Sequence, residues 1–146
     1  MTTTVHAYAA LDAGGRLEPY EHKLGRLGPD EVDLDVKSCG ICFSDVSMID
    51  NAWGFTPYPL VPGHEIVGMV RATGERVSHL AVGDVVGLGW NAGSCLVCAQ
   101  CMSGDHHMCA KAVSTSNNAM ASLAWATTVW YVAATCAAST AIWCWC

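Results

Sequence analysis

Four cysteines within fifteen residues constrain this chain of 146 residues more than any other feature of its sequence. They follow the pattern C-x2-C-x2-C-x7-C, at Cys95, Cys98, Cys101 and Cys109. Thiolates at these intervals can close around one tetrahedral Zn²⁺, with Zn–S bonds of about 2.3 Å. Such a closed shell has no open position, so the pattern predicts a metal that folds a small lobe rather than one that does chemistry.

An iron–sulfur cluster is the main alternative, because C-x2-C-x2-C also begins the ferredoxin pattern. Two features of the sequence argue against it. The last gap holds seven residues rather than three, and Ala110 rather than proline follows Cys109. We therefore predict zinc at the four cysteines.

Charge and cysteine usage limit the partners and the compartment of the chain. The formal net charge is -6 with seven basic residues, which argues against nucleic acid as a partner. No basic start followed by an apolar run occurs in residues 1–15, so we expect no signal peptide. Because cysteines lie at metal-ligand spacing rather than in a disulfide framework, we expect a reducing, cytoplasmic setting.

The composition changes abruptly at the end of the four-cysteine segment. Every charged residue, His, Gly and Pro lies at or before Lys111, and residues 112–146 are only apolar or aromatic residues, Ser, Thr, Asn and Cys. A natural domain rarely gives up charge and turn residues altogether. We predict a domain over residues 1–113 and an aberrant uncharged tail over residues 114–146.

Three interpretations of this tail stay open. An out-of-frame or truncated end agrees best with its composition. A membrane span is possible by length, but Ser, Thr and Asn interrupt the tail and no basic flank anchors it. A third interpretation is a helix that lies across the domain. We expect the tail to be irregular or helical.

The pattern of residues 5–90 predicts a mainly β domain with short helices. Residues 5–11 and 17–23 predict a hairpin around two glycines, with Pro19 confining the second strand to a sheet edge. Strict alternation over residues 31–37 predicts a half-buried strand, and residues 66–73 and 84–90 predict two more. Residues 44–51 predict a short helix with Ser44 as its N-cap. Short strands separated by glycine favour a small, partly open β-barrel.

A second set of possible metal ligands lies between Cys39 and Gly68. Cys42 and His64 stand beside turn residues, and carboxylates follow them at Asp45 and Glu65. A cysteine and a histidine together suit zinc. One such pair with 21 residues between its members also occurs without any role, so spacing alone leaves both interpretations open.

The residues of this segment resemble a known family. Cys-Gly-Ile-Cys-Phe-Ser-Asp at 39–45, followed by Pro-Gly-His-Glu at 62–65, is similar to the catalytic-zinc segment of zinc-dependent alcohol dehydrogenases of the medium-chain dehydrogenase/reductase family. With Asn-Ala-Trp-Gly at 51–54, it resembles the cinnamyl-alcohol-dehydrogenase-like branch. The resemblance covers about residues 5 to 113. It implies a GroES-like substrate domain with a structural zinc lobe at residues 91–111, in which His106 and His107 are loop residues rather than ligands.

The resemblance also implies roles for individual side chains. Cys42 and His64 would be two of three ligands of a catalytic zinc, which acts as a Lewis acid on an alcohol hydroxyl. Ser44 would begin the proton relay, Asp45 would orient the imidazole, and Glu65 would neighbour the metal and could approach it when substrate leaves. A packing role is implied for Cys39, which is not a ligand in the family.

Other positions are open or depart from the family pattern. Trp53 and Trp90 are candidates for an aromatic substrate wall, although a buried tryptophan is more often a core residue. Phe43 replaces the basic residue or His that usually contacts a cofactor phosphate. The third zinc ligand of the family has only a faint counterpart at Cys136, and weaker ones at Cys144 and Cys146.

The family's nicotinamide site is not expected in this chain. A Rossmann domain needs a G-x-G-x-x-G turn and a later acidic residue, and no glycine or acid follows Lys111. Two functions therefore compete. One is a zinc-dependent NAD(P) alcohol dehydrogenase acting on a small alcohol or aldehyde, represented by its N-terminal domain and inactive as a fragment. The other is a non-catalytic zinc-binding module. The individual alcohol, the choice of NAD or NADP and the oligomeric state stay open.

Overall fold

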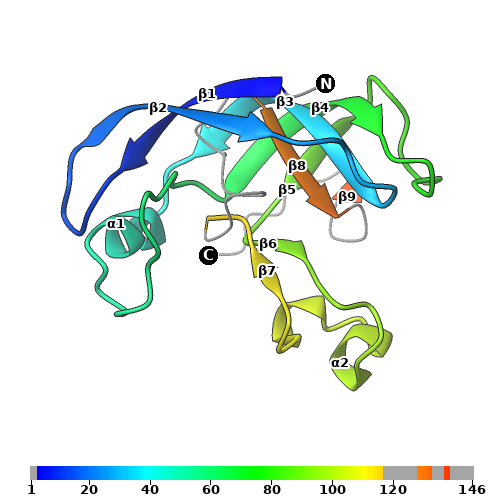
Figure 1. The fold of residues 1–146 in the computed structure, drawn as a ribbon. Coiled ribbons are helices and arrows are strands. Elements are labelled where there is room, and N and C mark those ends of the chain that lie inside the picture. Colours follow the sequence, from blue (N-terminus) through cyan, green and yellow to red (C-terminus); the bar gives the residue numbers. More distant parts are fainter. Residues whose placement is uncertain (1–2, 117–127, 133–136, 139–146) are drawn as a thin grey trace.

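The structure is a computed structural model that describes residues 3–116, 128–132 and 137–138 (Figure 1). The predicted mainly β fold with short helices is confirmed. The strands are β1 (Thr3–Ala10), β2 (Leu17–Leu24), β3 (Glu31–Gly40), β4 (Glu65–Thr73), β5 (Val85–Leu88), β6 (Asn91–Gly93), β7 (Val113–Ser114), β8 (Thr128–Val132) and β9 (Ala137–Ala138). The helices are α1 (Phe43–Ile49), α2 (Ala99–Met102) and the 3-10 turn η1 (His106–Met108).

The first two strands form the predicted antiparallel hairpin. Gly14 has a φ of +70°, which a glycine adopts without the strain of a side chain, and it allows the chain to reverse. Pro19 lies opposite Tyr8 in the register of β1 and β2. Among the described strands β2 pairs only with β1, so Pro19 lies in an edge strand, as predicted.

A five-stranded antiparallel sheet in the order β8-β3-β4-β5-β9 forms the centre of the molecule. The described strands leave this sheet open rather than closing it into a barrel, which agrees with the partly open barrel that we predict. Residues Ile66, Gly68 and Val70 of β4 are buried and the residues between them are half-buried, as the alternating side chains of a strand require.

The predicted tail contributes two strands to this sheet, which corrects our expectation of irregular or helical structure there. β8 pairs with β3 and β9 pairs with β5. The physical reason is that both partner strands would otherwise expose a row of backbone groups, and the Thr-Val-Trp-Tyr-Val sequence of β8 has high strand propensity. The domain boundary at residue 113 stays a prediction.

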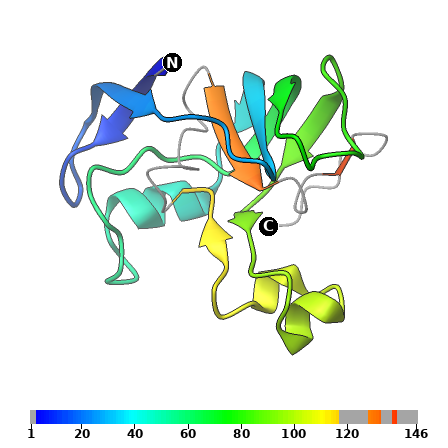
Figure 2. The ribbon, with the colours of Figure 1, turned by 45° about the vertical axis from the view of Figure 1, so that its right-hand side comes forward.

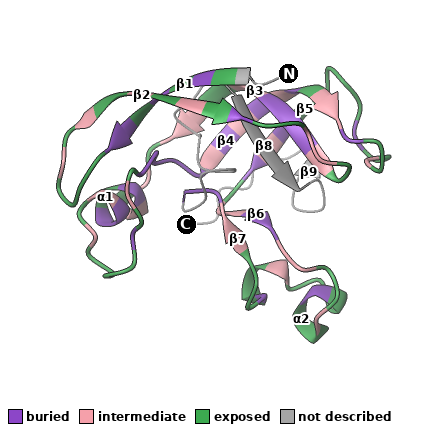
Figure 3. Cartoon of the chain, viewed as in Figure 1, coloured by how far each residue is buried: buried purple, intermediate pink, exposed green. Residues whose placement is uncertain are grey.

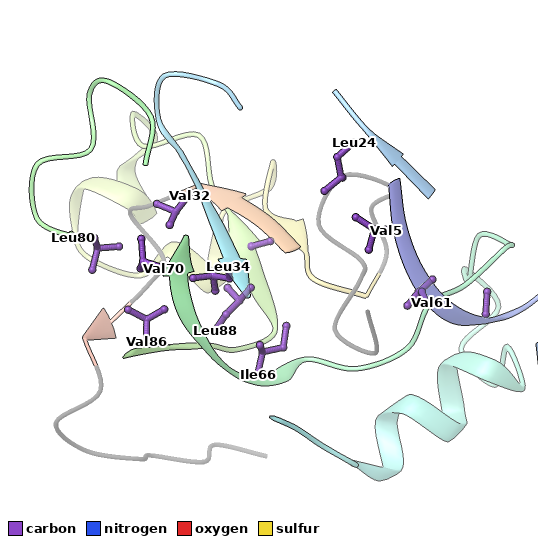
Figure 4. Close-up of a cluster of buried hydrophobic side chains, with 13 residues drawn as sticks. Val5, Leu24, Val32, Leu34, Val61, Ile66, Val70, Leu80, Val86 and Leu88 are labelled. Atoms are coloured by element: carbon purple, nitrogen blue, oxygen red, sulfur yellow. The ribbon is translucent and has the colours of Figure 1, made fainter. Parts of the chain in front are cut away.

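The hydrophobic core lies between the hairpin and the sheet. Figure 4 shows Val5 and Leu24 of the hairpin on one side, and Leu34, Val70 and Leu88 of the sheet on the other. All five of these side chains are at most 2% exposed. Burying aliphatic side chains in this way contributes about 1.5–3 kcal/mol each relative to leaving them in water. The core therefore fixes β3 and β4, whose ends carry the residues of interest.

The four-cysteine segment forms a lobe that projects from the sheet (Figures 1 and 2). Its neck is the antiparallel pair β6 and β7, and its tip is α2 with η1. Most of the lobe is exposed (Figure 3). Its residues Cys101 and Cys109 are buried. A unit with so few buried apolar residues needs another source of stability, such as a metal.

None of the helices in residues 3–116, 128–132 and 137–138 has the length and apolar composition that crossing a membrane requires.

Candidate metal centres

Helix α1 and its first turn place the side chain of Cys42 at the end of β3. The helix begins at Phe43 with Cys42 as its N-cap, so the prediction that Ser44 is the N-cap is wrong. The reason is that Asp45, in the first turn, accepts a hydrogen bond from the Cys42 N–H through Oδ2 at 3.0 Å, which caps the helix without a serine hydroxyl.

The loop that enters β4 carries His64, and a glycine shapes it. Gly63 has a φ of +107°, a conformation that residues with side chains rarely adopt. Its N–H donates to Asp45 Oδ1 at 2.9 Å. The turn aims the buried His64 side chain at the first turn of α1, so residues nearly twenty positions apart in the sequence meet.

Asp45 joins the two segments that carry the candidate ligands. Its Oδ1 lies 3.1 Å from His64 Nδ1, while its Oδ2 accepts from the Cys42 backbone. The side chain is 2% exposed. With the Nδ1 proton donated to this carboxylate, the lone pair of His64 lies on Nε2, which is the tautomer that a metal ligand requires.

The hydroxyl of Ser44 lies between the two candidate ligands. It donates to Cys42 Sγ at 3.1 Å and lies 3.4 Å from His64 Nε2. The Nε2 atom of His64 therefore faces Cys42 and Ser44, on the side of the ring away from Asp45. The predicted residues Cys42, Ser44, Asp45 and His64 thus form one constellation in the structure.

Glu65 completes a group of three potential ligands with Cys42 and His64, whose ligand atoms all lie within 4.8 Å of one another. Glu65 is paired with Gly40 across β3 and β4. A Cβ at Gly40 would lie 2.0 Å from Glu65 Oε2, so only glycine leaves room for the carboxylate in this position. A thiolate, an imidazole and a carboxylate form a donor set that fits zinc.

The electrostatics of this site follow from its hydrogen bonds. Burial alone would raise the pKa of Asp45, but the hydrogen bonds from His64 and the Cys42 N–H outweigh it and hold the pKa below its usual value. Burial alone would lower the pKa of His64, but the hydrogen bond and the negative charge of Asp45 raise it above its usual value. Each partner therefore favours the charged form of the other.

Aromatic side chains form a wall beside His64. The ring of Trp90 packs edge-on against the His64 ring with centroids 4.7 Å apart, and Trp53 meets Trp90 at 6.2 Å. Phe55 stacks on Trp53 at 5.7 Å and extends the wall, although our sequence analysis did not single it out. Phe43 is 81% exposed at the start of α1.

The four cysteines of the lobe come together as predicted. Their sulfur atoms lie within 4.8 Å of one another. The Sγ of Cys98 is 3.4 Å from that of Cys101 and 3.9 Å from that of Cys109, and Cys95 lies 3.9 Å from Cys101. Zn–S bonds of about 2.3 Å in a tetrahedron give sulfur–sulfur distances of about 3.8 Å, so the cluster fits zinc.

Backbone N–H groups and neighbouring thiols shift the pKa values of two cysteines of the lobe in opposite directions. The N–H groups of Val97 and Cys98 lower the pKa of the Cys95 thiol to about 6. The pKa of Cys98 is raised to about 11: the Cys101 N–H lowers it, but hydrogen bonds to neighbouring thiols and burial outweigh that effect. The Nδ1 atom of His106 and the hydroxyl of Ser94 share a hydrogen bond of 2.9 Å within the lobe.

The remaining candidates have different outcomes. Cys39 packs against the core as a half-buried residue, in agreement with the packing role implied for it. Cys136, Cys144 and Cys146 lie outside the described residues.

Sequence reasoning missed Ser116, whose buried hydroxyl donates to the Gly63 carbonyl at 3.1 Å. A bond from a serine to a backbone carbonyl leaves no signal in a single sequence.

Comparison with known proteins identifies the family. Residues 28–139 match the alcohol dehydrogenase GroES-like domain, so this chain belongs to the family of proteins that contain that domain. It is 57% identical over 111 residues to the aldehyde reductase AdhA of Synechocystis, a match that covers 76% of this chain and 33% of that protein. The predicted resemblance to zinc-dependent alcohol dehydrogenases is confirmed.

Two solved structures share the fold. A cinnamyl alcohol dehydrogenase from Sorghum bicolor superposes with a TM-score of 0.84 at 35% identity, over 92% of this chain and 40% of that one. A cobalt- and zinc-bound thermostable alcohol dehydrogenase from Pyrobaculum aerophilum gives 0.81 at 27% identity, over 96% and 42%. The chain therefore spans about a third of its curated relative and about two fifths of these structures.

Proposed function

We propose that this chain is the substrate-binding, zinc-carrying domain of a zinc-dependent alcohol dehydrogenase that interconverts an alcohol and an aldehyde with NAD(P). The observation that carries the proposal is the convergence of Cys42, His64 and Glu65 within 4.8 Å, with the Ser44 hydroxyl beside the first two. The relatives named as aldehyde reductase and cinnamyl alcohol dehydrogenase support the reaction class.

Different residues of the chain would bind the metal, transfer the proton and orient the ligands in this reaction. Cys42, His64 and Glu65 would hold the zinc, which would supply a Lewis acid that lowers the pKa of an alcohol or polarises an aldehyde. The Ser44 hydroxyl is placed to take up or return the hydroxyl proton of the substrate. Asp45 holds the His64 ring in the ligand tautomer.

The aromatic wall favours substrates with an apolar or aromatic body. Trp90 lies directly against His64, and Trp53 and Phe55 extend from it, at 47% and 56% exposure. Exposed aromatic rings beside a metal site provide contact area for a substrate ring and keep water away from the reacting carbon.

The chain as printed is expected to bind no nicotinamide and to turn over no alcohol by itself. No glycine follows Lys111, so the turn that would hold a pyrophosphate at a helix N-terminus is missing. Titration with NADH and with NADPH, followed by the fluorescence of the reduced cofactor, is expected to show no saturable binding. Micromolar binding would contradict this proposal.

A chimera tests the function itself. Residues 1–111 of this chain replace the matching part of the Synechocystis aldehyde reductase, which supplies the remaining two thirds. We expect aldehyde reduction with NADH or NADPH, abolished by Cys42→Ala and unaffected by Cys39→Ala. A folded, zinc-loaded chimera without activity would instead favour the non-catalytic zinc module.

A further inference from the structure

Ser116 lies just beyond the four-cysteine lobe, in the segment whose composition we interpret as aberrant. The chain leaves the lobe through β7, which pairs with β6, and the next two residues turn back toward the sheet. Thr115 and Ser116 are 0% and 1% exposed. Such complete burial of two hydroxyl groups requires partners for both.

The partners of these two hydroxyls differ. Thr115 Oγ1 donates to the Gly89 carbonyl at 2.6 Å, whereas Ser116 Oγ donates to the Gly63 carbonyl at 3.1 Å. The Gly63 carbonyl belongs to the peptide group that leads into His64. Ser116 therefore touches the backbone that carries a candidate ligand, and Thr115 does not.

Gly63 is held from both sides. Its N–H donates to Asp45 Oδ1 at 2.9 Å and its carbonyl accepts from Ser116. Its φ of +107° places it in a region where glycine has unusual freedom, so hydrogen bonds rather than side-chain sterics must fix this turn. Asp45 holds the His64 ring and the N–H of the peptide group that joins Pro62 to Gly63. The carbonyl of the next peptide group, which joins Gly63 to His64, accepts its hydrogen bond from Ser116 instead.

We infer that Ser116 is a positioning residue of the Cys42–His64–Glu65 metal site, which it serves by fixing the Gly63–His64 peptide. The inference rests on the proposed metal site. Groups that orient a metal ligand from behind typically change metal affinity by about 10- to 100-fold. Because Ser116 acts on the backbone of His64 and Asp45 still holds the ring, we expect the lower end, about tenfold.

The test measures Co²⁺ affinity at this site in the full chain. The readout is the thiolate-to-cobalt absorption that Cys42→Ala removes, so cobalt in the four-cysteine lobe does not contribute to the difference. Far-ultraviolet circular dichroism and thermal unfolding report whether each variant is folded. Thr115→Val is the matched control, since it removes a neighbouring buried hydroxyl with a hydrogen bond of its own.

We expect Ser116→Ala to bind Co²⁺ about tenfold more weakly than the unchanged chain, and Thr115→Val to bind it unchanged. Three results would overturn the inference: equal weakening of Co²⁺ binding in both variants, an unchanged Co²⁺ affinity in Ser116→Ala, or a Ser116→Ala variant that does not fold. If the unchanged chain shows no Cys42-dependent absorption, the proposed metal site fails and the inference fails with it.

Discussion

At the scale of single residues, Asp45 is the side chain on which the candidate catalytic site depends most. It contacts the backbone of Cys42, the N–H of Gly63 and the ring of His64. One carboxylate thus fixes both segments that bring ligands to the site.

Asp45→Asn tests this role. The amide keeps the shape but loses the charge and half of the accepting capacity, so we expect metal affinity at the Cys42 site to fall by about 10- to 100-fold. Competition with a chromophoric chelator measures the affinity. Asp84→Asn is the control, because Asp84 caps an exposed turn through the Ala81 N–H at 2.8 Å. Equal losses in both variants would contradict a specific role.

Gly40 is a second residue whose identity the site requires, on steric grounds: a side chain there would collide with Glu65 Oε2. We expect Gly40→Ala to displace the carboxylate and weaken the metal about tenfold. In a Glu65→Gly background the same change should have no effect, since both the carboxylate and the Glu65 Cβ, which would lie 2.9 Å from the new methyl group, are gone. Gly87→Ala, whose nearest contact would be 3.9 Å away, is the control. An effect of Gly40→Ala that persists without Glu65 would refute the steric explanation.

At the scale of elements, an ion pair joins β3 and β4 near the end of the two strands that lies away from the site. Arg71 donates from Nε and Nη2 to Asp33 Oδ2 at 2.9 and 2.7 Å, and the Asp33 side chain is 9% exposed. Asp33 Oδ1 has no hydrogen-bond partner in the described residues. The buried carboxylate therefore relies on Arg71.

Replacing Arg71 is expected to weaken the sheet. Arg71→Met leaves the Asp33 carboxylate buried without its partner, at a cost of about 1–3 kcal/mol in the free energy of unfolding. Arg76→Met breaks a similar fork with the half-exposed Asp30 and should leave stability unchanged within error, because exposed pairs contribute little. Urea unfolding compares the two. Similar losses would show that burial of Asp33 is not the cause.

The elements that could be predicted are those with a local pattern. Alternation in residues 31–37 and the glycine-centred hairpin give β1 to β3 directly, because strand periodicity and turn chemistry are local properties. β8 and β9 were not predicted: the residues of β8 favour a strand, but the pairing of β8 with β3 and of β9 with β5 is not visible in a single sequence. Likewise, the N-cap of α1 could not be predicted. The cap is Cys42 rather than Ser44, and the hydrogen bond from the Cys42 N–H to Asp45 Oδ2 forms only when the first turn of the helix is in place.

At the scale of the whole molecule, the described residues contain two different groups of potential metal ligands, one beside the five-stranded sheet and one in the lobe. The lobe offers four thiolates that enclose a cation, while the site at the end of β3 offers three different ligands beside an aromatic wall. The candidate ligands could be named from the sequence because the spacing of the four cysteines is distinctive and because the segments around Cys42 and His64 resemble a known family. The contact from Ser116 to the Gly63 carbonyl could not be predicted, because it joins residues far apart in the sequence that meet only when the chain is folded.

Metal content under chelator competition tests this two-centre account most directly. The closed lobe should keep one zinc through dialysis against a mild chelator, and the open site should bind a second that the same chelator removes. Cys42→Ala should abolish only the weak zinc, and Cys101→Ser only the tight one. Two zincs of equal resistance, or a zinc content that neither substitution changes, would contradict the account.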